Sequence, residues 1–210
     1  MRILELFCGD NHSFSKHAIE KGHTAVTVDN NPRTNPDILT DMLKWDYKAA
    51  DLGDIDMLWA SPPCRVYSVA RTRKKTTPEE FAASNALVHK TLEIIGYLNP
   101  MFWVIENPQT GKMKDQGILD AFDYADVDQC MYGRGSRERT RLWNNFGLIQ
   151  RPMCRVRNRC AAFEGTRHLL KTDAGTYKQK STIEKDLCLD ILRQITLGDR
   201  LHDGLELTNA

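Results

Sequence analysis

Two short polar motifs carry the residues of this sequence that could do chemistry, and each follows an apolar run typical of a buried strand. Ser61-Pro62-Pro63-Cys64 follows residues 56–60, and Glu106-Asn107-Pro108 follows residues 102–105. Two prolines stiffen the first turn. A cysteine that projects from it beside Arg65 could ionise and act as a nucleophile, whereas a buried structural thiol is the alternative. Glu106 is a candidate general acid or base if it lies near Cys64, and otherwise a hydrogen-bond acceptor at a strand end.

The first apolar run and two later acids predict a nucleoside-bearing cofactor. The turn Phe7-Cys8-Gly9 precedes a helix start and brings backbone N–H groups close to a ligand. Asp29 ends the second predicted strand and is placed to bind ribose hydroxyls, and Asp41 could accept a hydrogen bond from an adenine amino group. The sequence has no G-x-x-x-x-G-K-[ST] motif and no complete G-x-G-x-x-G motif, which disfavours ATP and dinucleotides. S-adenosyl-L-methionine has no phosphate and fits better.

Three arginines alternate with other residues in the segment Arg137–Trp143. On a strand this spacing places Arg137, Arg139 and Arg141 on one face. Such a row either faces a phosphate or base of a substrate or belongs to a solvated edge strand.

The elements that must position these residues alternate between strands and helices. This order predicts an α/β fold, a doubly wound Rossmann-like sheet followed by a small, irregular Arg/Cys-rich segment near the C-terminus. The predicted strands are 3–7, 24–28, 38–41, 56–60, 102–105, 125–131 and 141–143, and the predicted helices are 13–21 (capped by Ser13), 78–98, 119–122 and 183–195. Ligands bind beyond the carboxyl ends of strands in such sheets, so one edge is expected to hold Gly9, Asp29, Asp41, Cys64 and Glu106.

The composition is that of an ordinary globular protein and excludes a disordered or collagen-like chain. The 210 residues are 41% hydrophobic and 27% charged, with a formal net charge of +1, so one domain with a full core is expected. No apolar stretch approaches the roughly 18–20 residues of a membrane span. The N-terminus is typical of a strand rather than a signal peptide, so a soluble cytoplasmic protein without a membrane partner is expected.

Basic residues are concentrated in one segment. Residues 131–181 carry twelve Lys/Arg and three Asp/Glu, a net charge of +9, against −8 for the remainder. The segment either binds a polyanion or is a solvated loop, and charge alone favours neither. Arg155, Arg157 and Arg159 are interpreted as contacts to a nucleic-acid backbone, because arginines at such interfaces mostly bind phosphates.

The ordered set of motifs resembles the DNA (cytosine-5) methyltransferase family. The Ser-Pro-Pro-Cys and Glu-Asn-Pro-x-x-Gly forms are most similar to short phage or prophage members, and the resemblance spans about residues 1–145. It implies that Cys64 attacks C6 of a cytosine flipped out of double-stranded DNA and that Glu106 engages the N3 edge of that base. It also implies that Arg139 and Arg141 support the flipped base.

The resemblance implies the cofactor S-adenosyl-L-methionine and the residues that surround it and the DNA. Expected cofactor contacts are Phe7, Gly9, Asn11, His12, Ser13, Asp29, Asn30, Asp41, Met42 and Pro62. Expected DNA contacts are Arg65, Ser68, Arg71, Arg137, Arg155, Arg157 and Arg159. The expected protein is a monomer in the cytoplasm of a bacterial or phage-infected cell, and roles such as restriction-modification stay open.

The implied organisation has three parts. Residues 1–147 form a catalytic domain, residues 148–182 form a small basic segment that serves as a reduced target-recognition region, and residues 183–210 form a helix that packs back on the catalytic domain.

Three positions depart from the family's pattern. Asn11 stands in place of the second glycine of the cofactor turn, and Arg65 and Arg137 stand where glutamine is common. Only about 65 residues follow the arginine strand, fewer than a full target-recognition domain uses. Two alternatives therefore stay open: a methyltransferase acting on cytosine in RNA, and a catalytically silent DNA-binding protein that keeps the fold.

Six scattered cysteines predict no disulfide framework. Cys154, Cys160 and His168 have the ligand types of a zinc site, but their spacing is wider than usual, and either Cys130 or Cys188 would have to complete it. Free cysteines in an irregular loop are the favoured interpretation, so no metal is predicted.

Overall fold

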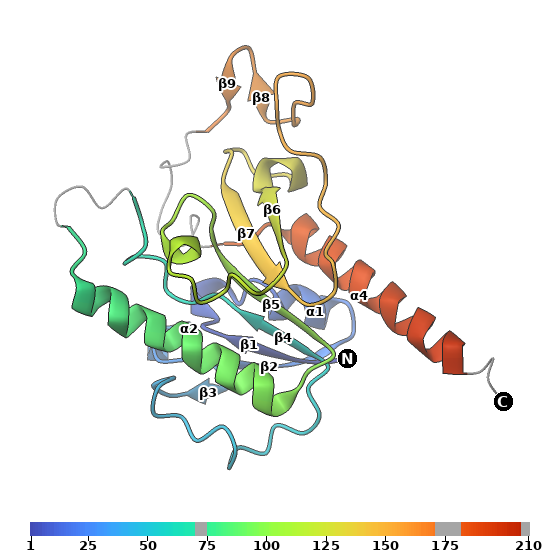
Figure 1. Ribbon diagram of the computed structural model, residues 1–210. Coiled ribbons are helices and arrows are strands. Elements are labelled where there is room, and N and C mark those ends of the chain that lie inside the picture. Colours follow the sequence, from blue (N-terminus) through green and yellow to red (C-terminus); the bar gives the residue numbers. More distant parts are fainter. Residues whose placement is uncertain (70–74, 171–181, 207–210) are drawn as a thin grey trace.

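A seven-stranded sheet positions the Ser-Pro-Pro-Cys, Glu-Asn-Pro and arginine motifs (Figure 1). The computed structural model describes residues 1–69, 75–170 and 182–206. The strands are β1 (Arg2–Leu6), β2 (Thr24–Asp29), β3 (Ile38–Leu39), β4 (Met57–Ala60), β5 (Phe102–Pro108), β6 (Tyr124–Asp128) and β7 (Arg139–Asn144), in the order β3-β2-β1-β4-β5-β7-β6. The first five are parallel, and β7 runs antiparallel to both β5 and β6. The predicted doubly wound α/β class is confirmed.

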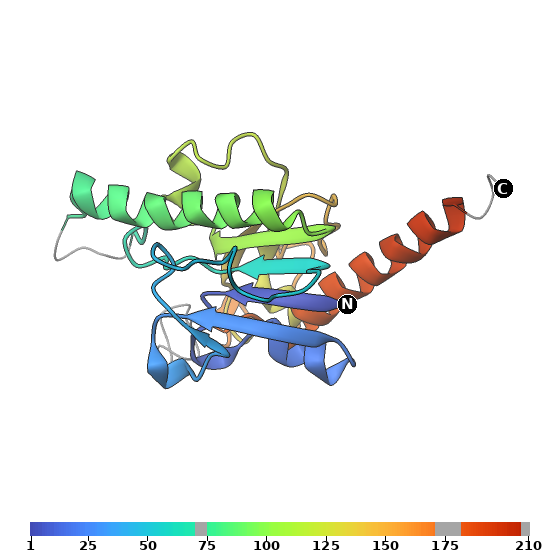
Figure 2. The same ribbon diagram turned by 90° about the horizontal axis from the view of Figure 1, so that it is seen from below.

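Helices cover both faces of the sheet (Figure 2). The α-helices are α1 (Ser15–Glu20), α2 (Pro78–Leu98) and α4 (Lys185–Glu206), and the 3-10 helices are η1 (Gly9–Asn11), η2 (Pro32–Thr34), η3 (Met113–Asp115) and η4 (Gln129–Tyr132). A separate hairpin of β8 (Phe163–Glu164) and β9 (Arg167–His168) lies beyond the β6–β7 end of the sheet (Figure 1). In the part of the chain that the structure describes, no helix is long and apolar enough to cross a membrane.

Alternate residues of β1 build the two cores. Leu4 and Leu6 pack in the cluster that α2 covers, whereas Ile3 packs with α1 and α4. In the cluster that contains Ile3, Phe14 stacks on Trp59 with ring centroids 4.5 Å apart. Because β1 lies between β2 and β4, all three apolar side chains are fully buried. This burial fixes the strand ends that carry the motifs.

The start of α1 differs from the sequence prediction. The helix begins at Ser15, and Ser13 does not cap it. The buried carboxylate of Glu5 accepts hydrogen bonds from the backbone N–H groups of Phe14 (3.2 Å) and Ser15 (2.9 Å). Ser13 instead accepts a hydrogen bond from the backbone N–H of Ile183, just before α4. Glu5, a residue of β1, therefore caps the N-terminus of α1.

Other predicted boundaries shift for local reasons. The predicted helix at 119–122 is a turn, because a few residues between turns are too short to sustain a helix. The predicted strand 125–131 ends at Asp128, where the chain enters η4, and the predicted strand 38–41 ends at Leu39. The last helix begins at Lys185 and continues to Glu206, beyond the predicted end at residue 195.

We expect Glu5→Ala to destabilise the fold, because two buried N–H groups lose their acceptor. The free energy of unfolding should fall by about 1–3 kcal/mol in urea titrations followed by circular dichroism. Asp51→Ala, which removes an exposed acid from a loop, serves as the control and should leave the midpoint unchanged. Equal midpoints for the two variants would show that Glu5 does not cap α1.

Candidate active site

The carboxyl ends of the parallel strands gather the predicted site residues at one edge of the sheet. Cys8 follows β1, Asp29 ends β2, the Pro-Pro-Cys loop follows β4, and Glu106 lies near the end of β5. β1 pairs with both β2 and β4, and β4 pairs with β5, so these ends are neighbours. The predicted edge is therefore present.

The turn after β1 is built around positive φ angles. Phe7 has a φ of 58° and Gly9 a φ of 57°, and a Cβ added at Gly9 would meet no atom within 4 Å. Asp29 holds this turn, because its Oδ2 accepts a hydrogen bond from the Gly9 N–H (3.0 Å) and its Oδ1 accepts one from the Asn31 N–H (2.8 Å). The half-buried carboxylate keeps lone pairs for a further donor. The space above Gly9 and the acid beside it fit a ribose-bearing ligand.

The other predicted cofactor residues come from this turn, from the loops after β2 and β3, and from the cysteine loop after β4. His12 contacts the backbone carbonyl of Thr34 through Nε2, and Asn11 belongs to η1. Asp41 is exposed and accepts a hydrogen bond from the Leu43 N–H (3.0 Å). Met42 and Pro62 are buried, and Asn30 is exposed.

Asn107 ties the end of β5 to the cysteine loop. Its Nδ2 donates a hydrogen bond to the backbone carbonyl of Pro62 (2.9 Å), and both groups are buried. Its Oδ1 is buried without a hydrogen-bond partner in the described part of the chain. A buried unpaired acceptor is costly, so this atom marks a place where a ligand or water can donate.

The loop that carries Cys64 contacts the turn after β5, and this contact requires a glycine at position 111. The Tyr67 N–H donates to the Cys64 carbonyl (3.0 Å), and the Tyr67 carbonyl accepts from the Lys112 N–H (2.9 Å). A Cβ at Gly111 would lie 3.0 Å from the Pro108 carbonyl oxygen and 3.5 Å from the Tyr67 oxygen. The glycine of the Glu-Asn-Pro-x-x-Gly motif therefore allows the two loops to approach each other.

Glu106 is a buried carboxyl group with a raised pKa. It is 8% exposed and accepts a hydrogen bond from the Thr140 hydroxyl. Burial raises the pKa of Glu106 to about 7; the Thr140 hydrogen bond lowers it, and the charge of Glu138 raises it. Near neutral pH this carboxyl group can therefore both hold and release a proton.

Cys64 carries the other half of the pair. Cys64 is exposed to solvent, but protein atoms also surround its thiol group. This desolvation raises the pKa of the thiol to about 11, and the negative charge of Glu106 raises it further. Glu106 thus acts electrostatically on Cys64. Between about pH 7 and pH 11 the Cys64 thiol keeps its proton while Glu106 is ionised. Transfer of that proton to Glu106 yields a thiolate beside a carboxylic acid.

The structure does not bring Arg139 and Arg141 to this pair. Each forms a two-pronged ion pair across the β6–β7 ladder, Arg139 with Asp128 (2.8 and 2.9 Å) and Arg141 with Asp126 (2.7 and 2.9 Å). Thr140, between them, points to the opposite face of β7 and reaches Glu106. The predicted cationic row is therefore neutralised by aspartates of β6. Arg137 precedes the strand.

Sequence reasoning missed the partners that organise the site. Thr140 binds Glu106, and Asp126 and Asp128 bind the arginines. Period-two alternation places Thr140 on the face opposite the arginines, which is a usable signal. Asn107 lies within a recognised motif, but its contact with Pro62 depends on the pairing of β4 with β5.

The predicted DNA contacts lie apart from one another along the chain. Arg65, Arg137, Arg155, Arg157 and Arg159 are exposed, and Ser68 is half-buried. Arg71 lies outside the described residues.

Comparison with known proteins identifies the family. The family described as C-5 cytosine-specific DNA methylase matches residues 15–123, about half of the chain. A protein of Frog virus 3 (isolate Goorha), designated "Probable DNA (cytosine-5)-methyltransferase", is 36% identical over 203 residues and covers 88% of this chain and 92% of its own. This chain belongs to the C-5 cytosine-specific DNA methylase family. The resemblance inferred from the ordered motifs is confirmed.

Solved structures confirm the Rossmann-like methyltransferase fold of this methylase. The Entamoeba histolytica methyltransferase EhMeth superposes with a TM-score of 0.52 at 17% identity, covering 73% of this chain and 56% of its own. A prophage-encoded E. coli protein designated a DNA modification methyltransferase gives 0.51 at 18% identity, covering 69% and 46%. The methylase spans about half the length of these structures.

Family membership also confirms the predicted methyl donor, S-adenosyl-L-methionine. The open space at Gly9 and the remaining lone pairs of Asp29 fit its nucleoside part. Asn11 stands in place of a second glycine and lies in η1. Within η1 only Gly9 has a positive φ angle, so position 11 does not require glycine.

Alkylation of Cys64 should report the charge of Glu106. We expect the rate of reaction of the Cys64 peptide with iodoacetamide, followed by mass spectrometry, to rise with pH toward an apparent pKa of about 11. Glu106→Gln removes the negative charge that raises this pKa, so the thiolate fraction and the rate at pH 8 should increase. Glu20→Gln, on the exposed side of α1, is the control. A Cys64 pKa that stays the same or rises in Glu106→Gln would contradict the proximity of the two groups.

Proposed function

We propose that this methylase transfers a methyl group to C5 of cytosine in double-stranded DNA through a transient covalent bond between Cys64 and C6 of a flipped-out base. The observation that carries the proposal is that Cys64 and the buried Glu106 stand at the ends of the paired strands β4 and β5, which the hydrogen bond from Asn107 to Pro62 ties together. A nucleophile and an acid at the ends of adjacent strands are the two groups that this reaction needs.

The chemistry begins with proton transfer within the pair. Cys64 loses its thiol proton, and Glu106 holds a proton that it donates to N3 of the cytosine. The Cys64 sulfur forms a bond to C6, the C5–C6 double bond breaks, and the electron pair at C5 becomes nucleophilic. When bound, S-adenosylmethionine supplies the electrophilic methyl group. After methylation a base removes the C5 proton, the C6–S bond breaks, and Cys64 leaves as a thiolate while N3 returns its proton to Glu106.

Asn107 and Thr140 act as positioning residues in this scheme. Asn107 fixes the Pro62 carbonyl and so the loop that carries the nucleophile. Thr140 donates to the carboxyl oxygen of Glu106 and so orients it. A small loss of alignment is costly, because reacting atoms must be held close to their bonding geometry.

Access to C6 requires the base to leave the helix. A thiol cannot reach C6 within stacked bases, and flipping costs a few kcal/mol. Exposed cations of the segment 148–182, with Arg65 and Arg137 nearer the catalytic motifs, supply backbone contacts that offset this cost. In this proposal the segment is a reduced target-recognition region and the protein acts as a monomer. We keep the cytoplasm of a bacterial or phage-infected cell as the predicted location of the protein. The relative with 36% identity comes from Frog virus 3.

Methyl transfer to DNA is the direct test. We expect the full chain with labelled S-adenosylmethionine and unmethylated genomic DNA to yield 5-methylcytosine by nucleoside mass spectrometry, and Cys64→Ala to yield none. Asp51→Ala, which removes an exposed acid from a loop, is the control and should retain product. Product from Cys64→Ala would refute the covalent route. Product on RNA but not on duplex DNA would favour the RNA alternative, and cofactor binding without any product would favour a silent DNA-binding protein.

The basic segment should act through phosphates. We expect Arg155→Ala with Arg157→Ala to weaken binding to all duplex sequences and to reduce the slope of log Kd against log salt by about 1.8, at 0.9 per phosphate contact. Arg2→Ala with Lys21→Ala, at the opposite edge of the sheet, is the charge-matched control. An unchanged slope for the first pair would remove this segment from the DNA interface.

A further inference from the structure

Three cysteines and one histidine from separate stretches of the chain converge outside the candidate active site. Cys130 lies in η4, Cys154 and Cys160 lie in the loop after β7, and His168 ends β9. Their ligand atoms all lie within 4.8 Å of one another. The sequence favoured free cysteines because the spacing is wider than usual and either Cys130 or Cys188 would have to complete the set. The fold brings Cys130 to the other three ligands.

The spacing of these atoms suits a tetrahedral metal. Zinc binds thiolate sulfur at about 2.3 Å and histidine nitrogen at about 2.0 Å, so ligand atoms around one ion lie roughly 3.5–3.8 Å apart. Cys154 Sγ lies 3.5 Å from His168 Nε2. An ion therefore needs only a small contraction of the cluster.

The chemistry of the four groups favours a closed site. All three thiols are buried, and His168 is half-buried. Thiolate sulfur and neutral imidazole nitrogen are the forms of these side chains that bind metals, and a divalent cation would offset the repulsion among the thiolates. Three sulfurs and one nitrogen are a structural zinc set, with no position left for water.

The hydrophobic cluster around these ligands is small. It contains Cys130, Cys154, Cys160 and Ala162, with Met131 and Phe163 packed against it. Phe163 contacts the His168 ring edge-on at a centroid distance of 5.0 Å and orients it. A core this small does not by itself offset the entropy of ordering the surrounding loop. A metal cross-link supplies the missing stabilisation.

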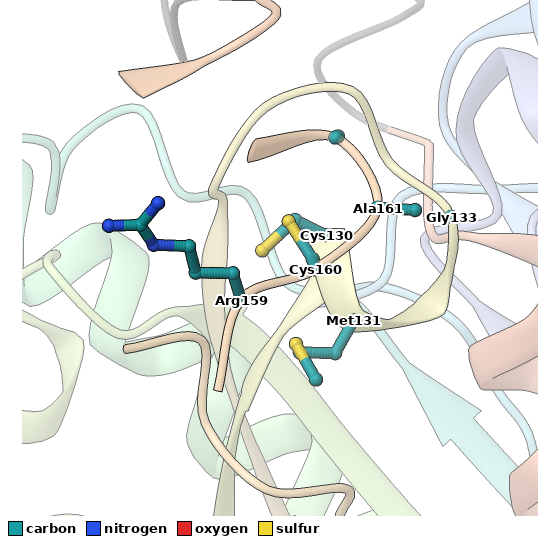
Figure 3. A pocket seen from close by; sticks show the side chains of 7 residues that line it. Cys130, Met131, Gly133, Arg159, Cys160 and Ala161 are labelled. Carbon is teal, nitrogen blue, oxygen red and sulfur yellow. The ribbon is translucent and has the colours of Figure 1, made fainter. Parts of the chain in front are cut away.

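A pocket beside the cluster provides a way in. It has a volume of about 260 Å³ and reaches Cys130 and Cys160, whose side chains Figure 3 shows with Met131 and Arg159 around them. The guanidinium of Arg159 points away from the sulfurs in that view and lies over the Phe163 ring.

We propose that Cys130, Cys154, Cys160 and His168 bind one Zn²⁺ ion as a structural site that fixes the basic segment to the β6–β7 end of the sheet. The backbone N–H of Cys154 donates to Asp128 Oδ2 (3.0 Å), and Asp128 also binds Arg139. The metal site and the sheet thus share one aspartate. The proposal stands independently of the methylation chemistry, since its readout is bound metal.

Metal content of the full chain tests the proposal. Protein purified without chelators should contain about one zinc per chain by inductively coupled plasma mass spectrometry. Exchange for Co²⁺ should give tetrahedral ligand-field bands and thiolate-to-cobalt charge-transfer absorption. Cys160→Ser and His168→Ala should lose most of the metal, whereas Cys64→Ser, which removes the exposed thiol, should retain all of it.

Thiol counting covers the case in which a ligand variant does not fold. Adding a chelator to the unaltered chain should expose three further thiols to a chromogenic disulfide reagent. Absence of bound metal after incubation with zinc or cobalt would overturn the proposal. So would metal that Cys160→Ser and His168→Ala both retain, or a chelator that exposes no thiols.

Discussion

The hydrogen bond from Asn107 Nδ2 to the Pro62 carbonyl joins the ends of β4 and β5, and the pair of Cys64 and Glu106 depends on it. The parallel pairing of these strands sets the spacing, and the side-chain bond fixes the loop that continues past the sheet. Gly111 lets the following turn approach without a clash. The Cys64 thiol held this way lies in the electric field of the Glu106 carboxylate.

The β6–β7 hairpin supports the site from the other side. Thr140 reaches Glu106 from one face of β7, while Arg139 and Arg141 bind aspartates on the other. The arginines therefore stabilise the hairpin and hold the strand that presents Thr140. The proposed zinc site extends this arrangement, because Asp128 links Arg139 to the loop of Cys154.

Sequence reasoning reaches the features that are local along the chain. Apolar runs and their polar ends give the five parallel strands and the site edge, and Thr77 with Glu80 forms the capping box that starts α2 where Pro78 indicates. Contacts that depend on which strands pair could not be predicted from the sequence. The register of β6 against β7 decides that Arg139 and Arg141 meet aspartates, and the packing of η4 against the later loop decides that Cys130 meets Cys154. Glu5 caps α1 through the fold, which no helix-start pattern reveals.

Covalent trapping tests the central claim, that Cys64 and Glu106 form one reactive unit, most directly. In duplex DNA that carries 5-fluorocytosine, C5 holds a fluorine that cannot leave as a proton, so the bond between Cys64 and C6 should persist. With S-adenosylmethionine present, peptide mass spectrometry should find the nucleotide on the Cys64 peptide in the unaltered chain, and trapping should slow by roughly 100-fold in Asn107→Ala. A bound duplex without adduct, or an adduct on another cysteine, would contradict the account.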